Sequence, residues 1–295
     1  MKYVIAALTP IFWGSTYAIV SLWLTDLSPL WVATWRALPA GILLILFMPK
    51  KLRALPVSAA KLTGLSFINI TAFFALLFIA AYRLPGSVAG TLTSTLPLQL
   101  LLLNWVFNKI RPAWSWLLLS LLGLAGIFLL LNPSANLDLI GVMAALGATL
   151  LIATSATWVQ RWKIENIVGL TGWQLLIGGL LLVPLAWIVE GPVQFPAIDQ
   201  VPALLWLSLA NTLLAYLIWF WSLKHLGSHI IGLLALLNPI TAVALGLLLV
   251  DESLSLIQWS GVALVLSALI LMKFINSRAL TNPTKTPPST THKAA

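Results

Sequence analysis

Residues 113–131 read AWSWLLLSLLGLAGIFLLL, an apolar stretch with no charged side chain. A helix needs about 20 mostly apolar residues to cross the hydrocarbon core of a bilayer. Arg111-Pro112 precedes the stretch and Asn132-Pro133 follows it, and proline at such positions ends helices. The stretch therefore predicts one membrane-spanning helix.

Nine further apolar stretches of similar length lie on either side of this one, separated by Pro- and Gly-containing breakers. The first could imitate a signal peptide, but its apolar run reaches Leu24 and no small-x-small cleavage pattern follows. The sequence thus predicts an all-α integral membrane protein with ten transmembrane helices. The predicted spans are residues 4–24, 28–48, 62–82, 84–107, 113–131, 139–160, 167–189, 201–223, 226–250 and 256–272.

The composition supports this class of protein. Hydrophobic residues make up 60% of the chain, charged residues make up 8%, and the mean hydropathy is +1.02. A soluble domain carries about 25% charged residues, so lipid must be the main solvent here. No gap between the spans is long enough for a soluble domain. The absence of cysteine excludes disulfides and thiolate metal sites.

The net charge of +9 indicates topology rather than nucleic-acid binding, because the basic residues lie in short loops. Of the 16 Lys and Arg residues, all except Arg36 and Arg83 fall on the side of the N-terminus. Of the 7 acidic residues, all except Glu165 fall on the other side. The positive-inside rule therefore predicts ten spans in a plasma (inner) membrane, with both termini cytoplasmic. Residues 276–295 are polar and predict a disordered cytoplasmic tail.

The two halves of the chain resemble each other. Thr34-Trp35-Arg36 matches Gly172-Trp173-Gln174 at an offset of 138 residues, and Asn69 matches Asn211 at an offset of 142. The second offset also aligns Leu84 with Leu226, Gly90 with Gly232 and Pro97 with Pro239. We expect two five-helix repeats, residues 1–133 and 137–275. Because five is odd, they insert in opposite directions, an arrangement found in secondary transporters with a midplane substrate site.

Several motifs carry a family resemblance: FWGSTY at 12–17, WRALPAG at 35–41, YRLPG at 82–86, GWQ at 172–174, LNP at 237–239 and DESL at 251–254. With these motifs the chain resembles an EamA-type transporter of the drug/metabolite transporter superfamily, and most of all its metabolite-efflux branch. The resemblance implies inverted five-helix repeats and export of amino acids, other metabolites or toxic compounds. One departure is FNKIR at 107–111, which lacks the acidic residue usual in the family there.

Arg36 is the charged residue that the sequence places deepest in a span. It lies about eight residues from the span end, hence about 10–12 Å deep at 1.5 Å per residue. A buried guanidinium usually faces a polar cavity or a partner. Two interpretations stay open: a clamp for a substrate carboxylate, or a structural arginine that snorkels or bonds neighbouring carbonyls. Gln174 occupies the matching place in the second half.

Other polar and aromatic side chains within the spans would suit an amphipathic solute, although amides and hydroxyls there can also serve helix packing alone. Pro97 and Pro239 are candidate hinges, or else static kinks. The predicted substrate-binding residues are Trp13, Thr16, Tyr17, Arg36, Asn69, Thr93, Thr154, Trp173, Gln174, Asn211 and Tyr216.

The sequence shows no carboxylate deep in a span, and Asp251, Glu252, His225 and His229 lie at span edges. The sequence therefore offers few groups that could carry protons across the membrane, and coupling by solute exchange is the alternative. No phosphate-binding loop, nucleophile–base set or metal-ligand set appears, so we expect no cofactor, no metal and no enzyme activity.

The prediction is a secondary transporter that exports small organic metabolites, amino acids or amphipathic amines by alternating access. We expect a monomer or weak dimer whose partners are the solute and the bilayer. An intramembrane enzyme acting on lipid or isoprenoid phosphates, or a channel, are the alternatives.

Overall fold

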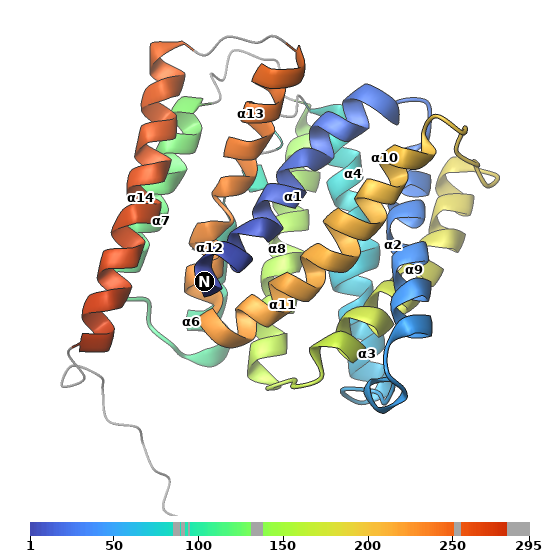
Figure 1. Cartoon of the computed structure of the whole chain (residues 1–295), viewed down its shortest axis with the longest axis horizontal. Helices are drawn as coiled ribbons and strands as arrows, with labels where there is room; N and C mark the ends of the chain where they lie inside the picture. Colours follow the sequence, from blue (N-terminus) through green and yellow to red (C-terminus); the bar gives the residue numbers. More distant parts are fainter. Residues whose placement is uncertain (85–88, 90–91, 94, 131–137, 251–254, 282–295) are drawn as a thin grey trace, which may run out of the picture.

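The computed structural model describes residues 1–281 except 85–88, 90, 91, 94, 131–137 and 251–254. All its elements in this part are helices, which confirms the all-α prediction (Figure 1). They are α1 (Lys2–Trp23), α2 (Pro29–Phe47), η1 (Lys50–Leu52), α3 (Ala59–Ser66), η2 (Phe67–Ala72), α4 (Phe73–Arg83), α6 (Leu96–Asn108), α7 (Trp114–Leu130), α8 (Leu139–Arg161), α9 (Ile167–Glu190), α10 (Val201–Leu205), η3 (Trp206–Leu214), α11 (Ala215–Leu226), α12 (Ser228–Leu234), α13 (Leu237–Val250) and α14 (Leu256–Thr281).

Within the described residues, seven helical stretches are long and apolar enough to cross a membrane. They are Lys2–Trp23, Pro29–Phe47, Ala59–Arg83, Leu139–Arg161, Ile167–Glu190, Val201–Leu226 and Ser228–Leu245. Shorter apolar helices occupy Leu96–Asn108, Trp114–Leu129 and Trp259–Ala268. Each predicted span therefore contains one apolar helical stretch.

The structure differs from the predicted spans at two points. Helix α14 continues to Thr281, so residues 276–281, predicted as disordered tail, are helical. Extending an existing helix avoids the cost of nucleation, which makes a polar continuation possible. The predicted span 226–250 is divided into α12 and α13 by Ala235 and Leu236. Residues 282–295, Gly90, Asp251 and Glu252 lie outside the described part of the chain.

Two helix pairs give the bundle its shape. Helices α7 and α14 pack against each other at one edge (Figure 1). Helices α2 and α9 form the other long pair, and glycine lets their backbones approach closely. A methyl group at Gly179 would lie 2.8 Å from Cα of Leu38, and one at Gly41 would overlap the backbone nitrogen of Leu176. These two contacts are related by the 138-residue offset seen in the sequence.

The remaining helices enclose the centre. Helix α1 packs against α11 and α13, and helix α8 packs against α4 and α6. Helix α2 contacts η3, while α9 contacts η2. The core between these helices is formed by a large buried cluster that includes Trp31, Phe74, Phe78, Tyr216 and Phe220.

Candidate functional site

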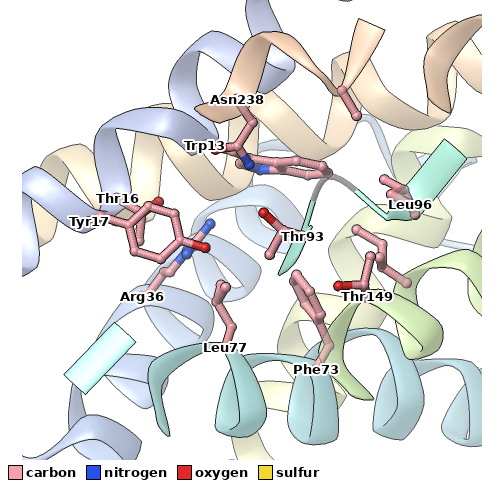
Figure 2. Close-up of a pocket in the computed structure, with 12 residues that line it drawn as sticks. Trp13, Thr16, Tyr17, Arg36, Phe73, Leu77, Thr93, Leu96, Thr149 and Asn238 are labelled. Carbon is pink, nitrogen blue, oxygen red and sulfur yellow. The ribbon is translucent and has the colours of Figure 1, made fainter. Parts of the chain in front are cut away.

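A cavity lies where α1, α2, α4, α6, α8 and α13 meet. Figure 2 shows Trp13 on one side of it and Phe73 and Leu77 on the opposite side. The cavity offers about 40 Å³ to the centres of water-sized molecules, enough for about three waters. A metabolite would therefore need the surrounding helices to move apart. The lining residues are Trp13, Thr16, Tyr17, Arg36, Phe73, Leu77, Thr93, Leu96, Thr149, Ile152, Ala235 and Asn238.

Arg36 brings a positive charge to this cavity. Its side chain is 1% exposed, and its guanidinium carbon lies 4.5 Å from the centre of the Phe74 ring. Nε donates to Oγ1 of Thr212 over 2.6 Å, and Nη2 donates to the Asn211 carbonyl over 3.1 Å. Nη1 is buried and has no hydrogen-bond partner among the described residues. Two of the three nitrogens thus anchor the group to η3.

The anchor of Arg36 is a π-helical segment, η3, which contains Asn211 and Thr212. In π-helical geometry the backbone bonds shift to i→i+5, and such segments are frequent at functional sites. The Thr212 hydroxyl supports this register, because it donates to the Leu207 carbonyl five residues earlier, over 2.8 Å. The Asn211 carbonyl also accepts from Nε1 of Trp13 over 3.0 Å. The Asn211 amide donates to Oγ1 of Thr16 over 3.0 Å, so this segment holds two cavity residues of α1 and one of α2.

A second π-helical segment, η2, contains Asn69, the residue that matches Asn211. Nδ2 of Asn69 donates to Oε1 of Gln174 over 2.7 Å. Oδ1 of Asn69 and Nε2 of Gln174 have no partner among the described residues, although both are buried. The Tyr216 hydroxyl donates to the Asn69 carbonyl over 3.3 Å. Asn69 and Gln174 are thus in contact, as Asn211 and Arg36 are, but here the asparagine side chain donates, whereas Arg36 donates to the Asn211 backbone carbonyl.

The structure divides the predicted site residues into three groups. The first group lines the cavity and consists of Trp13, Thr16, Tyr17, Arg36 and Thr93. Within it, the side chains of Tyr17 and Thr93 share a hydrogen bond. Asn69, Gln174, Asn211 and Tyr216 form the buried polar network beside it.

Thr154 and Trp173 do not line the cavity. The Thr154 hydroxyl donates to the Leu150 carbonyl of its own helix over 2.8 Å. The indole of Trp173 donates to the Arg53 carbonyl over 2.9 Å, at the end of the α2–α9 pair. These two residues therefore lie off the wall of this cavity, and their role in substrate binding stays a prediction.

The sequence prediction omitted part of the wall. Thr149 and Asn238 are polar, and Asn238 belongs to the LNP motif, which was a usable signal. The other omitted residues are apolar side chains without any sequence feature that separates them from lipid-facing ones. Pro97 is the second residue of α6 and Pro239 the third residue of α13, so both stand where a helix begins.

The fold and the cavity are those of a polytopic helical membrane protein with a mixed polar and apolar site among its helices. The sequence profile described as the EamA-like transporter family matches residues 1–132 and again 139–274. The chain belongs to this family, as its motifs indicated.

Relatives agree with this assignment. Protein PecM of Dickeya dadantii (strain 3937) is 35% identical over 272 residues, which is 90% of this chain and 90% of that protein. The uncharacterized inner membrane transporter YedA of Escherichia coli (strain K12) is 27% identical, over 89% of this chain and 87% of that one. A solved crystal structure matches with a TM-score of 0.77 at 17% identity, over 94% of this chain and 98% of that chain, which supports the fold.

Proposed function

We propose that this protein is a secondary transporter that exports small metabolites carrying a carboxylate and an apolar group, with amino acids as the leading class. The observation that carries the proposal is the Arg36 guanidinium, which is anchored through Nε and Nη2 and retains an unpartnered Nη1 at the cavity. A buried cation without a carboxylate partner is costly. A bound carboxylate would supply the missing partner.

The rest of the cavity wall fits the remainder of such a solute. Trp13, Tyr17 and Phe73 offer aromatic surface, and Thr93 and Thr149 offer hydroxyl groups that can accept from an ammonium. None of the described lining residues is acidic, so a bare amine would find no counter-charge in this wall. The arrangement favours amino acids over amphipathic amines.

We further propose alternating access between two inverted repeats, residues 1–133 and 137–275, in a plasma (inner) membrane with both termini cytoplasmic. The family profile matches two consecutive segments, and the packing of α1 on α11 and α13 is repeated by α8 on α4 and α6. In this proposal the cavity, which is too small for a metabolite, widens when the surrounding helices move apart. The cavity would open through bends at Pro97 and Pro239, which lie near the starts of α6 and α13. Solute exchange or proton coupling would drive the transport cycle.

Reconstituted vesicles test the substrate class. The full-length chain is placed in liposomes, and counterflow is measured for labelled aromatic and aliphatic amino acids and for the amines that lack their carboxylate. We expect counterflow of at least one amino acid and none of its amine. Arg36→Gln should abolish it, whereas Arg83→Gln, at the surface, should not. Equal transport of an amino acid and its amine, unaffected by Arg36→Gln, would refute the carboxylate-binding role.

A further inference from the structure

A second cavity lies at the bundle end where α6 and α8 finish and α12 begins. It measures about 810 Å³ on the same scale and is much larger than the central one. Arg111, Arg161 and Lys163 are exposed on its wall, and His229 adds an imidazole. We refer to the space bounded by these four residues as the basic pocket.

The basic pocket carries unbalanced positive charge. The sole ion pair within the described residues joins Arg83 to Asp138, away from this pocket. Arg111, Arg161 and Lys163 therefore have no carboxylate within ion-pair distance in the part of the chain that the structure describes. Glu165 lines an adjoining cavity, but Lys224 lines it too, so the excess of positive charge remains.

The floor of the basic pocket is ordered by a chain of hydrogen bonds. Nδ2 of Asn108 donates to Oδ1 of Asn104 over 2.8 Å, and Nδ2 of Asn104 donates to Oγ of Ser228 over 2.9 Å. This chain ties α6 to α12. The Trp116 ring meets the His229 ring edge-on, with 4.3 Å between the ring centres. The cations thus share the pocket with a polar network and a ring contact that involve α6, α7 and α12.

The remaining wall is apolar and continues onto the outside of the bundle. Leu101, Phe107 and Ile110 line the pocket beside the cations. Further along α6 and α7, Trp105 and Trp114 are exposed, and tryptophan is enriched at the membrane–water interface. A ligand here would meet cations at one end and apolar surface at the other.

We propose that the basic pocket binds the headgroup of an anionic phospholipid, with its acyl chains along the exposed apolar faces of α6 and α7. Basic pockets between transmembrane helices bind such headgroups, since each nearby cation adds attraction. A soluble anion would bind through the cations alone and would make no use of the apolar walls. The bound lipid would join the α6–α7 loop to the ends of α8 and α12, which border the central helices (Figure 1).

Native mass spectrometry of the full-length chain in detergent measures this binding directly. We expect dioleoyl phosphatidylglycerol to bind at least about tenfold more tightly than dioleoyl phosphatidylcholine. The variant Arg111→Gln/Arg161→Gln/Lys163→Gln should lose that preference. A matched variant, Lys2→Gln/Lys50→Gln/Lys51→Gln, removes the same charge elsewhere and should keep it. Lys163→Gln alone, an exposed change, should weaken phosphatidylglycerol binding severalfold even if the triple variant folds poorly.

Competition separates a lipid from a soluble anion. Glycerol phosphate at the lipid concentration should leave the bound phosphatidylglycerol in place, because it lacks the acyl chains. Complete displacement by glycerol phosphate would assign the pocket to a soluble phosphate instead. Equal binding of the two lipids, or equal loss in the two triple variants, would also overturn the proposal.

Discussion

Trp35 and Trp173, 138 residues apart, make the same hydrogen bond at opposite ends of the α2–α9 pair. The Trp35 indole donates to the Gln194 carbonyl over 2.8 Å, and the Trp173 indole donates to the Arg53 carbonyl over 2.9 Å. Each tryptophan thus fastens its own helix to the segment that follows the partner helix. The α2–α9 pair is thus fastened at both ends, and its α2 member contributes Arg36 to the central cavity.

The close approach within this pair predicts sensitivity to added volume. Gly41→Ala and Gly179→Ala should each destabilise the protein by about 1–3 kcal/mol, because the new methyl group meets backbone atoms that cannot yield. Gly64→Ala is the matched control, since no atom lies within 4 Å of a methyl group there. Thermal unfolding in detergent measures the effect. Similar melting temperatures for all three variants would contradict the close packing described.

Much of the fold was accessible from the sequence because long apolar stretches between breakers are a strong signal in membrane proteins. Arg36 was found as a candidate for the same reason, since a charge inside such a stretch is unusual. The apolar part of the wall, including Phe73, Leu77 and Leu96, could not be found. In a helix that is apolar all round, the pattern does not separate a residue facing a cavity from one facing lipid.

Hydrogen bonds that the sequence does not reveal explain the other differences. Trp173 has the sequence features of a site residue, but its indole is satisfied by the Arg53 carbonyl from a distant loop. The two π-helical segments also leave no clear pattern in the sequence. Their common feature, a buried asparagine at matching positions 69 and 211, indicates a polar group near the site but not a change of helical geometry.

The ion pair between Arg83 and Asp138 predicts a dependence on pH. The Gly141 backbone N–H donates to the Asp138 carboxylate, and this bond, together with Arg83 at 2.9 Å, lowers the pKa of Asp138. A lowered folded-state pKa means that the stabilisation is present above the unfolded value of about 3.9 and is lost as the pH falls through the folded value. The melting temperature of wild type should therefore exceed that of Asp138→Asn by a small, constant amount from pH 5 to 8.

Below pH 4 the two melting temperatures should converge, since the wild-type carboxyl then becomes protonated. Both groups are substantially exposed, so the difference at neutral pH should be small and should shrink in high salt. A difference that grows as the pH falls would contradict the assigned direction of the pKa shift.

Arg36→Lys separates a binding role from a packing role. Lysine keeps the charge but cannot reproduce a planar guanidinium that is bonded through Nε and Nη2 and that, in our proposal, binds a carboxylate through Nη1. We expect the KM for a transported amino acid to rise about tenfold or more, while the melting temperature falls only by a few degrees. An unchanged KM with a large loss of stability would show that Arg36 serves packing alone.

Cysteine labelling tests whether the transported solute binds in the cavity, and the absence of native cysteine makes each signal unambiguous. Thr93→Cys, Thr149→Cys and Asn238→Cys place thiols on the cavity wall. When the central helices open, a small polar thiol reagent should reach all three, and a bound solute should slow the reaction. Thr154→Cys lies on the same helix as Thr149 but off the wall, and Leu266→Cys lies on the exposed side of α14. Neither should be protected by solute, because neither lines the site. Equal solute protection at Thr149→Cys and Thr154→Cys would mean that the solute acts through a global change in helix packing, and the cavity would then not be its binding site.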